Sequence, residues 1–257
     1  MYKIFDTVDE VSRYTAQRLR DIILAKPEAV LGLATGGTME PMYARLVEML
    51  QTSPGDLSRL TTFNLDEYIG LAASHPQSYR YFMGRHLFDK LSLTPERVHL
   101  PDGLAEDIDG ACRAYSAAIQ AAGGLDLQLL GIGSNGHIGF NEPHTRFSCR
   151  THAIALSEQT RRDNGRFFND PDEVPTHALT LGIQDILEAR EVLLVATGPG
   201  KAGIMAELYR SDADEALPAS ALKRHPNVTI VMDSEAAALL PLGSDPTPGS
   251  DPAPHGV

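Results

Sequence analysis

Short apolar runs alternate with segments of helical periodicity along most of this sequence, and the alternation restricts the fold more than any other feature. The apolar runs predict strands at residues 3–5, 29–34, 60–65, 98–100, 125–130, 151–156, 177–181, 191–196 and 228–232. Helical periodicity covers residues 8–22, 39–50, about 78–91 and 108–121, and shorter helices are expected after residues 201 and 232. This order predicts an α/β fold, an open, mainly parallel, doubly wound sheet with helices on both faces.

The length and the C-terminal composition predict one domain followed by a tail. A chain of 257 residues can bury a sizeable core, and α/β folds of this length are often one domain. Residues 1–240 contain no sequence repeat and no interior linker. Residues 241–257, PLGSDPTPGSDPAPHGV, have the composition of a disordered segment. We expect a single domain over residues 1–240 and a disordered tail after it.

The charge balance argues against several classes of partner. The formal net charge is -12 and the pI is near 5.1, so nucleic acid and anionic membranes are not expected. The two cysteines, Cys112 and Cys149, provide no disulfide framework, which favours a reducing compartment. The start of the chain has no apolar signal region, and no apolar run reaches membrane-spanning length. We expect a soluble, cytoplasmic protein.

Four chemically unusual loops follow predicted parallel strands, after Ala34, Leu65, Leu130 and Ala196. Ligands of open α/β sheets bind at the carboxyl ends of the strands. The four loops are therefore expected to share one crevice, although they are far apart in the sequence.

The loop after Leu130 carries the most polar chemistry. In LLGIGSNGHIGFNEP, residues 129–143, the side chains of Asn135, His137, Asn141 and Glu142 follow an apolar run within eight residues. The intervening glycines allow sharp turns and a close approach of the backbone to a ligand. The combination of polar side chains and glycines in this loop is interpreted as a small-molecule binding site.

Two other interpretations of the same loop are weaker. Its glycines fit the dinucleotide-binding pattern GxGxxG, but glycine and proline occupy the positions at which the required helix would run. A metal site is also open to consideration, because several potential ligands are close in sequence; their spacings match no standard zinc pattern. The candidate ligands are His137, Glu142, His144, Cys149 and His152.

Two loops suit an anion. Thr35, Gly36, Gly37 and Thr38 precede a predicted helix and can expose backbone N–H groups to a phosphate. Taken alone, this stretch is better explained as a glycine turn with Thr38 as N-cap. Lys201 lies in the first turn of another predicted helix, where a cation is unfavourable unless an anion binds nearby.

The Lys201 loop is not a Walker A motif. Val195 stands where that motif has its first glycine, and Ala202 replaces the residue that would hold magnesium. A lysine that points into solvent remains the alternative for this loop.

Asp66 ends an apolar run in FNLDEY. A carboxylate at the rim of a partly dry pocket can act as a general base, but an isolated aspartate more often caps the next element or forms a turn. The adjacent Glu67 is expected to point elsewhere in either case.

The sequence resembles the glucosamine-6-phosphate deaminase family over about residues 1–240. The resemblance is carried by LGLATGGTMEPMY, FNLDEYIGL followed by HPQSY, GIGSNGHIGFNEP, CRT, NGRFF, HALTLGI and the lysine after ATGPG. The related 6-phosphogluconolactonases share the glycine loops but lack the FNEP sequence. The resemblance implies conversion of glucosamine 6-phosphate and water to fructose 6-phosphate and ammonia, without a metal or an organic cofactor.

The resemblance also assigns catalytic roles. Asp66 matches the base that moves a proton between C2 and C1 of the opened sugar. His137 matches the residue that opens the pyranose ring, and Glu142 matches its acidic partner. Asn135 occupies the third position of this relay, which is Asp in some members and Asn in others. An Asn can orient His137 but cannot share charge with it, so the pH profile is expected to differ.

For the phosphate, the resemblance implies a cradle made by residues 35–38, Arg166 and Lys201, and a mobile lid at about residues 156–176. The allosterically activated hexamers of the family have basic residues at the positions of His152 and Ile154. Because Ile154 cannot bind a phosphate through its side chain, we expect a monomer or small homo-oligomer without activation by N-acetylglucosamine 6-phosphate. The alternatives are a galactosamine-6-phosphate deaminase, a 6-phosphogluconolactonase or a non-catalytic sugar-phosphate sensor.

Overall fold

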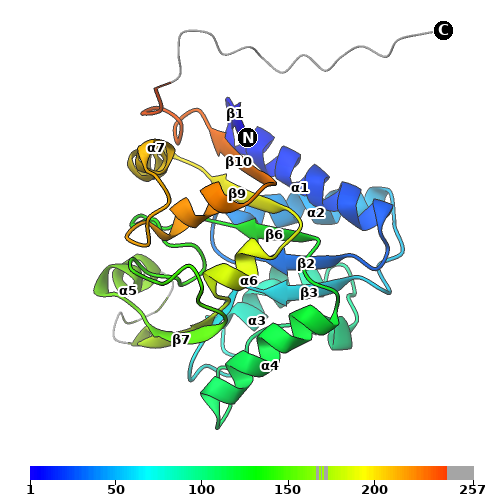
Figure 1. Cartoon of the computed structure of the whole chain (residues 1–257). Coiled ribbons are helices and arrows are strands. Elements are labelled where there is room, and N and C mark those ends of the chain that lie inside the picture. The colour runs from blue at the N-terminus through cyan, green and yellow to red at the C-terminus, as the bar shows by residue number, and fades with distance from the viewer. Residues whose placement is uncertain (166–167, 169, 171–172, 242–257) are drawn as a thin grey trace, which may run out of the picture.

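The structure is a computed structural model that describes residues 1–165, 168, 170 and 173–241. A seven-stranded sheet forms the centre, and a second sheet of three strands lies beside it (Figure 1). The central sheet has the order β1-β10-β9-β6-β2-β3-β5, and its strand pairs are parallel. The predicted α/β fold with a mainly parallel sheet is therefore confirmed.

The strands of the central sheet lie close to the predicted apolar runs. Their bounds are Tyr2–Phe5 for β1, Val30–Leu33 for β2, Thr61–Asn64 for β3, Val98–His99 for β5, Leu127–Leu130 for β6, Val192–Ala196 for β9 and Val228–Asp233 for β10. Strands β2, β6 and β9 are buried along their whole length. Such strands, covered on both faces, are apolar at nearly every position rather than at alternate ones.

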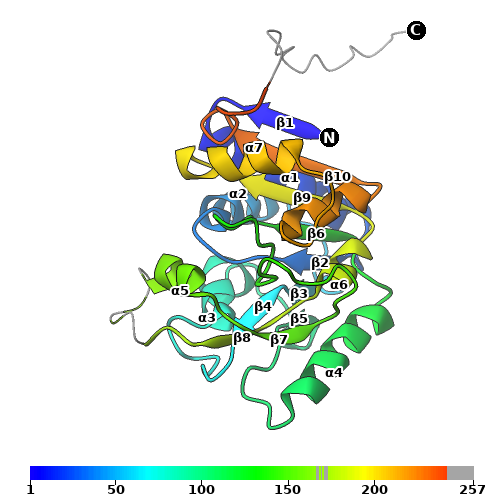
Figure 2. The same cartoon turned by 60° about the vertical axis from the view of Figure 1, so that its left-hand side comes forward.

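Helices cover both faces of the central sheet. The α-helices are α1 (Val8–Ala25), α2 (Met39–Thr52), α3 (Tyr79–Met83), α4 (Ile108–Ala121), α5 (Glu158–Gly165), α6 (Ile183–Leu187) and α7 (Ala202–Arg210). Helices α1 and α2 lie side by side on one face, and α4, α6 and α7 lie on the other (Figures 1 and 2). Helix α1 begins with a capping box in which Thr7 and Glu10 satisfy each other's backbone N–H groups.

The second sheet differs from the expectation. Strands β4 (Asp66–Tyr68), β8 (His177–Thr180) and β7 (His152–Ala155) form an antiparallel sheet of their own, in the order β4-β8-β7. The chain leaves the central sheet at Leu65, whose N–H still bonds to the carbonyl of Leu33 while its carbonyl accepts from Leu181. The sequence predicts the strands but not the point at which the chain changes from one sheet to the other, because the apolar run continues through Leu65.

Several further elements depart from the sequence prediction. The segment predicted as one helix at 78–91 divides into α3 and a π-helical turn, η1 (Gly84–Phe88). The predicted alanine-rich helix after residue 232 is wrong: residues 234–239 form turns, in which the N–H of Ala237 reaches back four residues but that of Leu240 only three. Helix α6 and the 3₁₀ helices, η2 (Pro95–Arg97), η4 (Pro199–Lys201) and η5 (Pro218–Arg224), are too short to leave a clear period.

The central sheet brings the carboxyl ends of β2, β3, β6 and β9 to one edge. Helix α2 begins at that edge with Met39. Among the described residues, no helix is both long and apolar enough to cross a membrane.

Candidate active site

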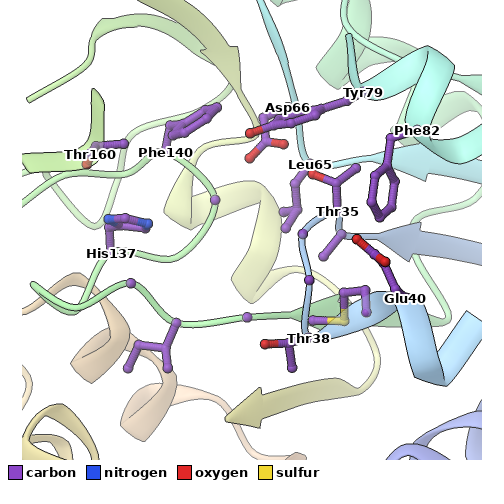
Figure 3. Close-up of a pocket in the computed structure, with 18 of the residues that line it drawn as sticks. Thr35, Thr38, Glu40, Leu65, Asp66, Tyr79, Phe82, His137, Phe140 and Thr160 are labelled. Atoms are coloured by element: carbon purple, nitrogen blue, oxygen red, sulfur yellow. The ribbon is translucent and has the colours of Figure 1, made fainter. Parts of the chain in front are cut away.

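One pocket of about 870 Å³ opens at the carboxyl edge of the central sheet. Its lining includes residues from all four of the loops singled out in the sequence, namely Thr35, Gly36, Gly37, Thr38, Asp66, Gly131, Gly133, His137, Thr197 and Lys201. The expectation that these loops share one crevice is confirmed. Figure 3 shows His137, Phe140 and Thr160 on one side of the pocket, Asp66 and Tyr79 along another, and Thr35 and Thr38 facing them.

Asp66 occupies the first position of β4 and is buried at the pocket wall. Burial and, to a smaller extent, the neighbouring Glu67 carboxylate together raise the pKa of its carboxyl group to about 8. A carboxylate with such a pKa is a stronger base than an exposed one and can both take up and return a proton near neutral pH.

Glu67 points away from the pocket, as the sequence analysis expected. Its Oε1 accepts from the N–H groups of Tyr68 at 2.8 Å and Tyr79 at 3.0 Å, and its Oε2 accepts from the N–H of Arg80 at 2.9 Å. Burial raises the pKa of Glu67, and these backbone bonds oppose the rise. Glu67 therefore ties the start of α3 to β4, and so fixes the backbone on which Asp66 stands.

Glycines of the loop after β6 place His137. A methyl group at Gly133 would lie 2.2–2.4 Å from three atoms of the His137 ring, so the ring packs directly against the glycine backbone. At Gly139 (φ 56°) a methyl group would lie 2.8 Å from Thr180 Oγ1 and 3.6 Å from Asp66 Oδ2. Gly133 thus allows the backbone to pack against the His137 ring, and a side chain at Gly139 would crowd Thr180 Oγ1 while lying at ordinary contact distance from Asp66.

Glu142 lies next to this wall, with its carboxylate held by hydrogen bonds on both sides. Asn135 Nδ2 donates to Glu142 Oε2 at 2.7 Å, and Asn135 Oδ1 accepts from the backbone N–H of His137 at 3.2 Å. On the other side, Ser157 Oγ and Thr160 Oγ1 both contact Glu142 Oε1. Asn135 therefore connects Glu142 to the backbone of His137.

The two anion-binding candidates lie in the same pocket. Thr38 is the N-cap residue of α2, as expected, but its side chain makes no capping hydrogen bond within the described structure and stands in the pocket lining (Figure 3). Lys201 lines the pocket as well, and its Nζ donates to the carbonyl of Ile132 at 2.7 Å. The alternative of a lysine in solvent is therefore wrong.

The remaining sequence predictions divide into three groups. Arg166 lies outside the described residues. Asn135 and Glu142 lie outside the pocket lining and join it through Thr160. The dinucleotide alternative fails as argued, because residues 136–149 run as turns with one isolated bridge between Ile138 and Asn141.

The candidate metal ligands do not come together as a group. In the described part of the chain, no three His, Cys, Asp or Glu side chains are grouped so that they could hold an ion. Cys149 Sγ does contact His152 Nδ1, at 3.3 Å.

Several pocket residues were not identified from the sequence. Tyr79 and Phe140 have parallel rings 6.0 Å apart beside Asp66. Thr160 comes from a polar stretch that has no clear period. Tyr79 belongs to the HPQSY motif and Phe140 to GIGSNGHIGFNEP, whereas nothing in the sequence marks Thr160.

Comparison with known proteins identifies the family. Residues 5–231 match the model of the glucosamine-6-phosphate isomerases/6-phosphogluconolactonase family. The chain belongs to this family. The match spans the central sheet from β2 to β9, most of β10 and the loops that line the pocket, so the site and most of the fold lie within the family region.

Relatives within the family are similar over nearly their whole length. A glucosamine-6-phosphate deaminase of Shouchella clausii is 48% identical over 90% of this chain and 94% of its own. Glucosamine-6-phosphate deaminase 1 of Bacillus subtilis is 46% identical over 91% of this chain and 97% of its own. A solved structure of a monomeric glucosamine-6-phosphate deaminase has a TM-score of 0.91 and 45% identity, covering 93% of this chain and 99% of that one.

The lactonase branch of the family shares only the fold at this level. The 6-phosphogluconolactonase of Trypanosoma brucei has a TM-score of 0.76 with 21% identity, covering 93% of this chain and 97% of that one.

Proposed function

We propose that this chain converts glucosamine 6-phosphate and water to fructose 6-phosphate and ammonia. The observation that carries the proposal is the placement of Asp66, with its raised pKa, and His137 in one pocket. The reaction needs two separate proton-transfer groups, one for opening the sugar ring and one for moving a proton between two carbons. Deaminases that are 46–48% identical over about nine-tenths of the chain support this substrate.

The phosphate is the handle by which the substrate is positioned. Residues 35–38 lead into the start of α2, where backbone N–H groups and the helix dipole favour an anion. Lys201 supplies a positive charge from the loop after β9, and Arg166 completes the proposed cradle. Binding energy gained at the phosphate then serves the reaction at C1 and C2.

Ring opening is assigned to His137, because the unperturbed pKa of histidine lies near neutrality. In the proposed step, His137 gives a proton to the ring oxygen as the bond from that oxygen to C1 breaks. The C1 hydroxyl gives its proton to His137, so that an open-chain aldehyde results and His137 returns to its starting protonation state. Glu142 and Asn135 position this group through the contacts of the loop.

The isomerising step is assigned to Asp66. Its carboxylate removes the proton from C2 while the C1 oxygen gains one from the ammonium group at C2, which gives an enolamine. Asp66 then returns its proton to C1, and the nitrogen at C2 becomes an iminium. Water adds to C2, ammonia leaves, and the ketone of fructose 6-phosphate remains. One base serves both carbons because C1 and C2 are adjacent, and Asp66 is fixed at the start of β4.

The same proposal includes the domain organisation, the oligomeric state and the cellular location of the protein. A domain over residues 1–240 carries the reaction, and residues 156–176, several of which lie outside the described residues, act as its lid. The predicted tail at residues 241–257 lies outside the described residues except for Pro241. Ile154 packs in the apolar cluster around Tyr68 and Phe140, which suits a structural position and not a phosphate ligand. We propose a monomer or small homo-oligomer in the cytoplasm; the monomeric relative of known structure supports the first part.

A coupled assay with the purified protein tests the proposal. Glucosamine 6-phosphate should yield ammonia and fructose 6-phosphate in equal amounts. The galactosamine epimer and 6-phosphogluconolactone are tested in parallel; a faster reaction with either would reassign the substrate. Binding of glucosamine 6-phosphate without ammonia release would indicate a sensor and refute the proposed activity.

A further inference from the structure

A hydroxyl of helix α5 contacts Glu142, one of the three residues assigned to ring opening with His137 and Asn135. Thr160 Oγ1 makes a short contact with Glu142 Oε1, and Ser157 Oγ lies 3.1 Å from the same oxygen. Asn135 Nδ2 holds the other oxygen, Oε2, at 2.7 Å. Thr160 is 2% exposed and lines the pocket. The carboxylate of Glu142 is therefore held by its own loop on one side and by the α5 segment on the other.

The direction of these hydrogen bonds follows from the available protons. An ionised carboxylate only accepts, so each hydroxyl in contact with it must donate its single proton. Ser157 Oγ accepts from the backbone N–H of Thr160 at 3.1 Å and lies 3.0 Å from Thr160 Oγ1. Thr160 Oγ1 therefore donates to Glu142 Oε1, whereas the single proton of Ser157 Oγ has two acceptors within reach, Glu142 Oε1 and Thr160 Oγ1.

The Thr160 hydroxyl is not needed to form α5. The cap interaction at the start of the helix comes from Ser157, whose side chain satisfies the N–H of Thr160. A valine has nearly the shape of threonine and would fill the same space. A buried hydroxyl that the helix does not require, directed at a carboxylate of the site, calls for another explanation.

We infer that Thr160 is a positioning residue for ring opening, acting through Glu142. Its hydroxyl fixes the carboxylate so that Glu142 and Asn135 together hold the His137 loop in its working geometry. The inference rests on the proposed function, because it assigns Thr160 to one step of that reaction. Figure 3 shows Thr160 near His137 on the same side of the pocket.

The test compares Thr160→Val with Thr160→Ser. The valine variant removes the donor and keeps the shape, so kcat for ammonia release should fall about tenfold, the size expected for a hydrogen bond to a charged group. KM should stay within about threefold, because the phosphate contacts are untouched. The serine variant keeps the donor and should restore kcat to near the wild-type value.

A second readout separates ring opening from binding. The reduced open-chain analogue, an amino-alditol 6-phosphate, has no ring to open. Its affinity, measured by calorimetry, should be equal for the wild-type protein and the Thr160→Val variant. Thr52→Val is the matched control: it makes the same substitution at an exposed hydroxyl at the end of α2, outside the pocket lining, and activity should be unchanged.

Wild-type ammonia release is the reference in each experiment. If the wild-type protein is inactive, the proposed function is refuted, and with it the inference that rests on it. With an active wild type, the inference is overturned if Thr160→Val keeps its kcat, if Thr160→Ser is equally slow, or if the loss lies wholly in KM. Thermal melting monitors folding, and Thr160→Ala replaces the valine variant if that one does not fold.

Discussion

At the scale of single residues, the two proposed proton-transfer groups, Asp66 and His137, lie on different segments of the chain and in different environments. Asp66 lies buried beside another carboxylate, which raises its pKa to about 8. His137 lies against a glycine backbone on a different loop. The separation allows each group to be tested by a substitution that leaves the other in place.

Gly133→Ala should displace the His137 ring. The new methyl group would lie 2.2 Å from the ring, so the histidine must move. Misplacement of a catalytic group by about 1 Å can cost about a hundredfold in rate, and we expect kcat to fall by that order while the protein stays folded. Gly203→Ala is the control, because open space surrounds that position and α7 tolerates alanine. Wild-type kcat in Gly133→Ala would contradict the placement of His137.

Asn135→Asp should change the pH dependence of activity. The substitution puts a second carboxylate where the amide now donates to Glu142 at 2.7 Å. Two carboxylates so close share one proton and titrate as a pair, with one proton held to a higher pH. The pH profile of kcat/KM for the variant should therefore show an additional ionisation that the wild-type profile lacks. Superimposable profiles would show that the Asn135–Glu142 contact does not influence catalysis.

At the scale of secondary-structure elements, the site depends on the junction between β4 and α3. Glu67 accepts three backbone hydrogen bonds there, from Tyr68, Tyr79 and Arg80. The junction orients Asp66 on one side and brings Tyr79 to the pocket on the other.

Glu67→Gln should destabilise the protein by about 2 to 4 kcal/mol, because an amide group replaces one acceptor oxygen and faces buried N–H donors. Urea unfolding measures the change in the free energy of unfolding. Glu48→Gln, which affects an exposed ion pair with Arg45, should change it by less than about 1 kcal/mol. Equal effects of the two substitutions would mean that Glu67 does not hold the junction.

The sequence predicts the strands and long helices well because buried parallel strands and amphipathic helices leave clear periods; α4, for example, has the bounds that its pattern predicts. It does not predict that β4 leaves the central sheet, since the apolar run passes through Leu65 without a break. Asp66 and His137 carry recognisable chemistry in their loops. Thr160 does not, because its role arises from a contact with Glu142, 18 residues away.

At the scale of the whole molecule, the buried Asp66 links stability to pH. The pKa of Asp66 is about 8 in the folded protein, and an unfolded aspartate has a pKa of about 3.9. Between these values the folded state binds more protons than the unfolded state, so stability falls as the pH rises from about 4 to about 8.

Asp66→Asn removes this ionisation and should therefore stabilise the protein increasingly with pH. The gain in the free energy of unfolding should be small near pH 4 and reach up to about 5 kcal/mol near pH 8. Urea unfolding at several pH values measures it. A gain that is constant over this range would mean that burial does not hold the proton on Asp66.

The same substitution provides the most direct test of the central claim, that Asp66 is the base of a sugar-phosphate isomerase-deaminase. Turnover of glucosamine 6-phosphate and affinity for the reduced open-chain analogue are measured in parallel for the wild-type protein and Asp66→Asn. The account predicts that the variant binds the analogue with an affinity close to that of the wild type, while ammonia release falls by at least about a thousandfold. Undiminished ammonia release by the variant would contradict it.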